Sequence, residues 1–377
     1  GWDLLFQHTA QRLDTEGLFE FNPLKSTNSD LNDSTFSPNE ADDKVDISQW
    51  TLKGMVAGLE VIYNGSYTER RFNGKTDYTA YVEVGGSAAY YTCTLARDQC
   101  FSPVSTTLEY SKTERIVQEI RVATNLENRF KAIGGVYYDD NKLNFLTDFF
   151  WDGAVNAGLA PNFSIPGAFT NTGGLARPAG VVFFNDFQAD REEISFFGEI
   201  AYDITDRLTA TFGTRYYSID IGLKGSSNFG SRATGPEADG GNNVDARLAG
   251  QTPKNLSDFI FKANLSWQTT DDALLYFTFS QGFRSGGFNR AAGRGVRAPG
   301  TDGPDDPGSP GIPASFDTDD VDSYELGFKT TWLDNTLRIN GAAYHVDFKG
   351  LQQGVLDFSI TNTTFFDNVG NAKIDGA

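Results

Sequence analysis

Residues 193–203 read Glu193-Ile194-Ser195-Phe196-Phe197-Gly198-Glu199-Ile200-Ala201-Tyr202-Asp203, and after Ile204-Thr205-Asp206 the chain continues as Arg207–Asp220. In an extended chain, successive side chains point to opposite faces. One face of this segment therefore carries apolar side chains, namely Ile194, Phe196, Ile200 and Tyr202. The other face carries Ser195, Glu199, Ala201 and Asp203. This alternation predicts two antiparallel strands joined by a tight turn, with one apolar and one polar face.

Similar pairs of segments recur along the chain. Leu256–Trp267 leads through four residues into Asp272–Arg284, and Val321–Thr331 leads through four residues into Thr336–Phe348. Loops of about thirty to fifty residues separate the pairs, and this alternation of short turns and long loops is typical of outer-membrane β-barrels. The other predicted strands are Trp2–Arg12, Lys44–Met55, Leu59–Glu69, Lys112–Asn125, Arg129–Asp139 and a last one near Val369–Ala377, with the longest loop over Asp140–Asp190.

The predicted fold is therefore all-β, a transmembrane antiparallel up-and-down β-barrel. A soluble sheet with one face in water has the same alternation, so the pattern alone does not decide between them. The asymmetry in the lengths of the connections favours the membrane barrel.

The composition agrees with strands and turns. The chain of 377 residues contains 31 Phe, 15 Tyr and 40 Gly, and aromatic residues favour strands. The formal net charge of −19 argues against nucleic acid as a partner. The chain contains no apolar run of the roughly 18 residues that a transmembrane helix needs.

The two cysteines, Cys93 and Cys100, lie close together in a loop-like stretch. Such a pair predicts a disulfide and an oxidising compartment. The alternative is two unpaired thiols, and nothing nearby resembles a metal site.

Four stretches make the chain resemble the barrel of a TonB-dependent outer-membrane receptor. Leu275–Asn289, which reads LYFTFSQGFRSGGFN, is similar to the family pattern Y-x-x-x-S-x-G-F-R-S-G-G-F-N, and Ser323–Lys329 resembles S-Y-E-x-G-x-K. The other two are Phe197–Asp206 running into Gly213–Tyr216, and Gln118–Thr124 followed by Gly134–Tyr138. Together they lie between about residues 110 and 375, in family order.

The resemblance implies a larger parent protein. Such receptors have a 22-stranded barrel around an N-terminal plug, with a TonB-contacting box before the plug. The chain is expected to be a partial barrel domain over residues 1–377, with about 12 of those strands and without plug, box or closing C-terminal strand. An open sheet of that size leaves two unpaired edges, which hydrocarbon does not tolerate.

The resemblance also implies the function of the parent. It would be a receptor in the bacterial outer membrane that imports a scarce ligand with energy delivered by TonB, in contact with lipid and lipopolysaccharide. A ferric siderophore is the commonest ligand in the family, and cobalamin, haem and oligosaccharides are others. A passive porin and a soluble, secreted adhesin or glycan-active enzyme remain as alternatives from other classes.

Arginines cluster in the loop after residue 285. This loop contains Arg290, Arg294 and Arg297, and Arg284 ends the predicted strand before it. Four arginines thus fall within fourteen residues of a chain that is acidic overall. Guanidinium groups bind carboxylates and phosphates in bidentate geometry, so these residues are candidates for binding an anionic ligand. They are alternatively partners of lipopolysaccharide phosphates or of the acidic residues Asp302, Asp305 and Asp306. Arg284, which belongs to the shared strand motif, is expected to be structural at the barrel mouth.

The loop aromatics Tyr90, Tyr91 and Trp151 are candidates for stacking on a ligand, with loop packing as the alternative. The acidic group Asp317, Asp319, Asp320 and Asp322 offers hard oxygen ligands but lacks the pattern of a calcium loop. It is better explained as a solvated strand entrance, and we expect no metal or cofactor.

The sequence offers little support for an enzyme. His8 and His345 are the only histidines, and there is no H-E-x-x-H, G-x-S-x-G or P-loop motif. We therefore expect no catalytic residues.

Overall fold

The computed structural model describes residues 1–17, 35–80, 92, 100–124, 129–151, 153, 171, 177–229, 244, 248, 250–252, 254–290, 292, 296–297, 309–356 and 364–377. Twelve strands form one sheet. They are β1 (Trp2–Glu16), β2 (Glu40–Val56), β3 (Leu59–Asp77), β4 (Ser105–Ala123), β5 (Phe130–Trp151), β6 (Val181–Thr205), β7 (Leu208–Phe229), β8 (Lys254–Thr270), β9 (Ala273–Arg284), β14 (Asp319–Trp332), β15 (Leu337–Lys349) and β18 (Ala372–Gly376).

Three short strand pairs lie outside this sheet. They are β10 (Gly287–Phe288) with β13 (Ser315–Phe316), β11 (Val296–Arg297) with β12 (Ser309–Pro310), and β16 (Gln352–Val355) with β17 (Phe365–Asn368).

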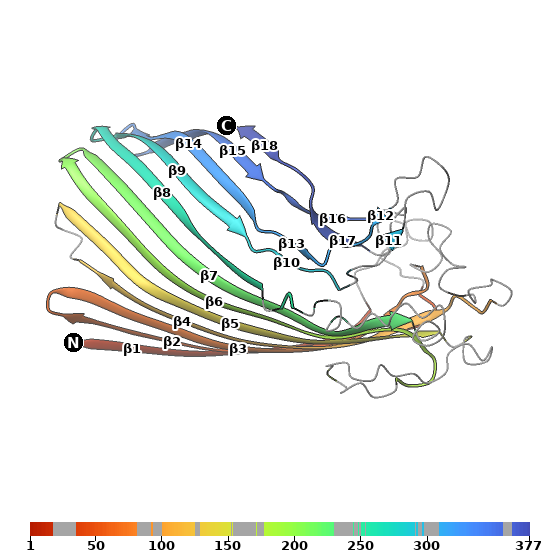
Figure 1. The fold of residues 1–377 in the computed structure, drawn as a ribbon. Helices are drawn as coiled ribbons and strands as arrows, with labels where there is room; N and C mark the ends of the chain where they lie inside the picture. Colours follow the sequence, from red (N-terminus) through yellow and green to blue (C-terminus); the bar gives the residue numbers. More distant parts are fainter. Residues whose placement is uncertain are drawn as a thin grey trace, which may run out of the picture.

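The twelve strands pair antiparallel with their neighbours in chain order, as an up-and-down sheet does. The sheet curves into an incomplete barrel wall, with β1 at one edge and β18 at the other (Figure 1). The short turns gather at one end, which we call the turn end, and the three small strand pairs lie at the opposite loop end. The predicted all-β antiparallel barrel fragment of twelve strands is confirmed.

The connection between β2 and β3 shows how the sequence closes a turn. Val56 pairs with Leu59, so two residues make the turn, and both adopt positive φ, 51° at Ala57 and 82° at Gly58. Two-residue hairpins of this kind need positive φ at both positions because their twist then matches that of the strands. Gly58 meets this requirement without strain.

The predicted strand ends are wrong at the loop end, where β1 to β7 continue further than expected. β5 runs on to Trp151 and β6 begins at Val181, so both borders of the predicted loop Asp140–Asp190 lie inside strands. Beyond the bilayer, both faces of a hairpin can be covered by protein, and the simple alternation then disappears. Phe145 and Phe187 stack across this extension with ring centroids 4.9 Å apart.

The apolar face carries large exposed side chains between two rows of mostly aromatic residues. Five strands place such residues eight positions apart: Phe130 and Tyr138, Ile194 and Tyr202, Leu208 and Tyr216, Phe259 and Trp267, Tyr324 and Trp332. Eight residues of strand span about 27 Å. With a strand tilt of about 40°, this length along the strand corresponds to a height of roughly 20 Å along the barrel axis. That height is close to the height of the apolar band of membrane barrels. The interval is therefore the bilayer-crossing part of the sheet.

Fully buried apolar side chains gather toward the loop end. Trp151 and Val182 form one cluster with Phe149, and Tyr217 and Ile219 form another. Phe283 and Phe288 pack on the Tyr217 cluster. Since Tyr217 lies on the polar face, the chain just after β9 folds against that face and so into the interior of the barrel.

Gly327 on β14 shows a close cross-strand contact on the polar face. A Cβ atom at this position would overlap the ring of Tyr276, whose hydroxyl donates to Glu325 Oε1 at 2.7 Å. We expect Gly327→Ala to destabilise the barrel by about 1–3 kcal/mol because the ring must leave its place. Urea titration of the full-length protein in lipid vesicles measures this. Gly282→Ala, where a Cβ meets nothing within 4 Å, is the control, and an equal loss there would contradict the explanation.

Candidate functional site

The polar face of β4 to β7 carries a group of five charged side chains that we call the arginine cluster: Arg115, Asp139, Arg191, Glu193 and Arg215. Arg115 donates from Nε and Nη2 to the two oxygens of Asp139, both at 2.8 Å. Arg191 joins the two carboxylates, with Nη1 3.1 Å from Asp139 Oδ2 and Nη2 2.5 Å from Glu193 Oε2. Arg215 forms an ion pair with the other oxygen of Glu193. Four strands thus meet in one network.

Strand register explains why these residues meet. Asp139 lies opposite Glu193 in the β5–β6 pair, so both carboxylates point to the same face. Their side chains are only 2% and 6% exposed, whereas those of Arg115, Arg191 and Arg215 are 48%, 31% and 34% exposed. The carboxylates are therefore buried under the guanidinium groups that compensate them. Three positive and two negative charges leave the cluster with a net charge of +1.

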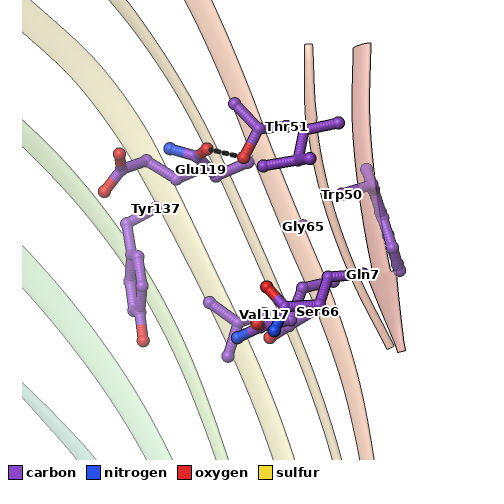
Figure 2. A pocket seen from close by; sticks show the side chains of 11 residues that line it. Gln7, Trp50, Thr51, Gly65, Ser66, Val117, Glu119 and Tyr137 are labelled. Carbon is purple, nitrogen blue, oxygen red and sulfur yellow. Dashed lines mark hydrogen bonds between the residues drawn. The ribbon is translucent and has the colours of Figure 1, made fainter. Parts of the chain in front are cut away.

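A hollow of about 360 Å³ lies beside this cluster on the polar face of β1 to β5 (Figure 2). Its polar lining is mostly neutral, with the side chains of Gln7, Gln49, Thr51, Asn64, Ser66 and Tyr137, and Glu119 is its charged member. Thr51 donates to Asn64 Oδ1 at 2.8 Å within it. Tyr137 connects the hollow to the cluster, since the guanidinium of Arg215 lies 5.0 Å from the centroid of its ring. The two features together form one continuous polar wall.

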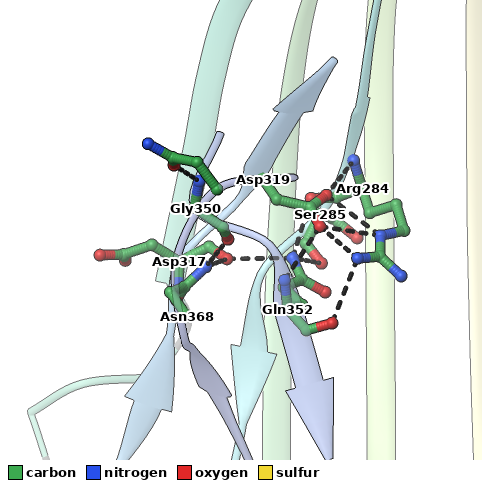
Figure 3. Close-up of polar contacts among 8 residues, drawn as sticks. Arg284, Ser285, Asp317, Asp319, Gly350, Gln352 and Asn368 are labelled. Atoms are coloured by element: carbon green, nitrogen blue, oxygen red, sulfur yellow. Dashed lines mark hydrogen bonds and ion pairs between the residues drawn. The ribbon is translucent and has the colours of Figure 1, made fainter. Parts of the chain in front are cut away.

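At the loop end, Arg284 and Asp319 fasten the end of β9 to the start of β14 and to the β16–β17 hairpin (Figure 3). The Asp319 carboxylate is fully buried. It accepts from Arg284 Nε at 2.9 Å and from the backbone N–H of Gln352 at 3.1 Å. Arg284 in turn donates from Nη2 to the carbonyl of Gln352 at 3.2 Å. We call these three residues the mouth clamp.

Two asparagines extend this anchoring of the hairpin. Asn289 donates to the carbonyl of Phe366 and accepts from its backbone N–H, both at 2.8 Å. Asn368 donates from Nδ2 to the carbonyl of Asp317 at 3.0 Å. The amide side chains satisfy backbone groups that a short hairpin would otherwise leave unpaired. The base of the hairpin is thus fixed against β10, β13 and β14.

The mouth clamp makes the hairpin sensitive to acid. Burial favours the neutral form of Asp319, but hydrogen bonds from Arg284 and Gln352 outweigh it and hold the pKa of this carboxyl below its usual range. A carboxyl group whose pKa is lowered by folding stabilises the folded state at pH values above its unfolded-state pKa, which is about 3.9 for Asp. This stabilisation is lost as the pH falls through the folded-state pKa. Below about pH 4 we therefore expect the amide hydrogens of the hairpin to exchange faster than the intrinsic pH dependence of amide exchange accounts for. Hydrogen exchange mass spectrometry on the full-length protein measures this, and Asp319→Asn should show no such pH step.

The structure describes the side chains of two of the four predicted arginines, Arg284 and Arg290, and gives them different contacts. Arg284 belongs to the mouth clamp, in agreement with its expected structural role. Arg290 donates to Asn185 on β6, so it contacts the polar face of the sheet. Arg297 lies in β11, but its side chain is outside the described residues, as is all of Arg294. Ligand binding by this group remains a prediction.

Trp151 corrects one prediction. It is the last residue of β5, is 1% exposed, and packs against Val182 and Phe149. Tyr78 and Phe101 also pack against this cluster, so loop packing is the correct explanation. Tyr90 and Tyr91 lie outside the described residues. Cys100 is disulfide-bonded, while Cys93 is outside the described residues, so their pairing stays a prediction.

The predicted acidic group does not converge on one point. Asp317 pairs with Lys254, Asp319 with Arg284, and Asp322 with Lys349. Each of these carboxylates thus has a cation of its own. Within the described part of the chain, no group of three or more His, Cys, Asp or Glu side chains could hold a metal ion.

Sequence reasoning did not identify the arginine cluster. A usable signal was present, because Asp139 and Glu193 occupy polar-face positions at the borders of predicted strands and Arg191 stands two residues before Glu193. What the sequence lacks is the cross-strand register that places Arg115 and Arg215 beside them.

A protein-family model described as "TonB dependent receptor-like, beta-barrel" matches residues 2–377. The chain belongs to the TonB-dependent receptor family. These proteins reside in the bacterial outer membrane. The long loops of this receptor barrel are accordingly extracellular, the turns periplasmic, and the polar face lines the lumen. The family consists of transporters and receptors, which are not enzymes.

Solved receptor structures share the fold of this TonB-dependent receptor barrel. The ferric yersiniabactin uptake receptor FyuA of Yersinia pestis is 13% identical, with a TM-score of 0.57 over 89% of this chain and 39% of its own. The FrpB iron transporter of Neisseria meningitidis is 12% identical, with a TM-score of 0.57 over 100% and 47%. The ferric-catecholate import receptor Fiu of E. coli K12 is 12% identical, with a TM-score of 0.55 over 100% and 52%.

The chain therefore spans roughly two fifths to half of the length of these structures. Among the described residues of the receptor barrel, no helix has the length and apolar character needed to cross a membrane.

Proposed function

We propose that this receptor barrel is part of an energised importer that takes up a scarce anionic ligand, a ferric siderophore, across the outer membrane. The observation that carries the proposal is the membership of the TonB-dependent receptor family over nearly the whole chain. TonB is the proposed energy-coupling partner, and it would contact a segment outside residues 1–377. Outer-membrane lipid and lipopolysaccharide are the proposed surroundings of the apolar face.

The preference for an anion rests on charge. The chain carries a net charge of −19, yet the arginine cluster places a net +1 on the lumen wall with its guanidinium groups partly exposed. A local positive site on the wall of an otherwise acidic protein favours ligands that bear carboxylate or phenolate oxygens. The structures similar to this chain include proteins named for ferric yersiniabactin and ferric-catecholate uptake.

Uptake of radioactive iron by intact cells tests the proposal. A strain that lacks the gene for this receptor should lose uptake of ⁵⁵Fe supplied with the cognate siderophore, and the full-length gene should restore it. Deletion of tonB or addition of a protonophore should abolish the restored uptake. Uptake that continues after either treatment would instead indicate a passive pore.

Oligosaccharide import by the same receptor class is a second candidate, and the hollow favours it. Neutral amides and hydroxyls such as those of Gln49, Asn64 and Ser66 suit sugar hydroxyls, since each can both donate and accept a hydrogen bond. Energised uptake of a labelled oligosaccharide, with no uptake of iron chelates by the same strain, would select this candidate.

A further inference from the structure

We propose that the arginine cluster is a carboxylate-binding site on the lumen wall, in which Arg115, Arg191 and Arg215 present their guanidinium groups to a carboxylate that enters the lumen. This deepens the proposed uptake function by naming the chemistry of one point on the path. The carboxylate can come from a soluble chelate or from an acidic side chain of a polypeptide segment inside the lumen.

The first argument is preorganisation. Asp139 and Glu193 are almost completely buried and hold the three guanidinium groups from beneath, through Arg115 on β4, Arg191 on β6 and Arg215 on β7. Arginine carries five N–H donors in a rigid fork. Arg215 also has a π contact to Tyr137, which fixes its plane. Donors that are already oriented lose little entropy when an oxyanion arrives.

The second argument is the balance of charge and donors. Two carboxylates cannot neutralise three guanidinium groups, so one positive charge remains for an incoming anion. The side chain of Arg115 is the most exposed of the three arginines, at 48%, and its Nε and Nη2 groups both donate to one carboxylate. A guanidinium group bound along one edge keeps other N–H groups available for a second acceptor.

The third argument is position. Asp139 directly follows Tyr138, which belongs to the row of residues at the extracellular border of the bilayer-crossing interval. The cluster therefore lies on the lumen wall below the mouth clamp. The hollow opens beside it through Tyr137. A ligand with an anionic group and a neutral, hydrogen-bonding body would find partners for both parts on one stretch of wall.

Citrate is the probe that tests whether the cluster binds a soluble carboxylate. Isothermal titration calorimetry at low ionic strength on the purified full-length receptor should detect citrate binding. Arg115→Gln should weaken it about tenfold, the value of one charge-assisted hydrogen bond of roughly 1.4 kcal/mol. In this variant Arg191 still compensates Asp139. The matched control is Arg121→Gln, lower on the same strand, where the arginine pairs with Glu119 at 3.6 Å; it should change citrate affinity less than twofold.

Cross-linking tests whether the cluster instead binds an acidic side chain of a polypeptide segment inside the lumen. In Arg115→Lys, a zero-length carbodiimide joins the new amine to any carboxyl group that it touches, and mass spectrometry identifies the partner. A cross-link to an acidic residue of the full-length receptor outside the barrel wall would assign the site to a lumen-filling segment. A cross-link to Asp139 alone, together with citrate binding, would assign it to a soluble carboxylate. If Arg115→Lys does not insert into the membrane, the same cross-linking experiment is done with Arg191→Lys.

The proposal is overturned if wild type binds no citrate and neither lysine variant cross-links to a carboxyl group other than Asp139 or Glu193. This outcome is independent of the uptake assay, because iron uptake can persist when the cluster has only a structural role. If the full-length gene restores no siderophore-dependent iron uptake although the purified receptor binds citrate, the proposed function alone would be rejected.

Discussion

Replacement of Phe212 by arginine is expected to destabilise the receptor barrel by about 2–4 kcal/mol, the cost of arginine at the bilayer midplane on the lipid face of a membrane barrel. Phe212 lies halfway between Leu208 and Tyr216, the two ends of the apolar row on β7, and is 48% exposed on the apolar face. Its ring also stacks on that of Phe261 at 6.2 Å. The loss of this contact and the charge placed in the lipid both destabilise the barrel.

The neighbouring residue provides the matched control. Thr211 lies at the same depth but on the polar face, and it pairs in register with Ala201 and Asn264. We expect Thr211→Arg to change stability by less than about 0.5 kcal/mol, since its charge stays in the aqueous lumen. Equilibrium urea unfolding of the full-length receptor in lipid vesicles, followed by tryptophan fluorescence, measures both. Equal costs on the two faces would show that this sheet does not separate lipid from water.

Asp319→Asn is expected to free the β16–β17 hairpin at the barrel mouth. The substitution removes the buried charge that faces Arg284. It also replaces one carboxylate oxygen by an NH2 group, so the N–H donors of Arg284 and Gln352 are left with one acceptor oxygen instead of two. Loss of one partner of a buried pair costs about 3–5 kcal/mol. Because the Arg284 side chain is 53% exposed and can turn to water, we expect about 2–3 kcal/mol locally. Amide exchange in the hairpin should therefore accelerate roughly thirtyfold to a hundredfold or more.

Hydrogen exchange mass spectrometry resolves this effect by peptide. Peptides that contain Gln352–Val355 and Phe365–Asn368 should exchange faster, while those of β6 should not change. Asp317→Asn is the control, because Asp317 is 84% exposed and pairs with Lys254 on the surface. Such exposed pairs are worth at most about 1 kcal/mol. If both variants behave alike, the mouth clamp does not anchor the hairpin.

The sequence by itself determined the faces of the strands and the end at which each turn lies. Ile194, Phe196, Ile200 and Tyr202 are all exposed on the apolar face, as their alternation predicted. A period of two is a local property of an extended chain, so it can be read without knowledge of any partner strand. The short turns are equally local, since the chain must reverse within two to six residues.

Only the tertiary structure decided which polar side chains meet. Arg115 reaches Asp139 across the β4–β5 pair, and Arg284 reaches Asp319 across 35 residues of sequence. Cross-strand partners depend on register, which is fixed by the whole ladder of a pair and not by the two residues concerned. The burial of Trp151 has the same origin, because Tyr78 and Phe101, which are distant in the chain, pack against the cluster that it forms with Val182. Local patterns thus set orientation toward lipid or water, and long-range register sets the chemistry of the lumen wall.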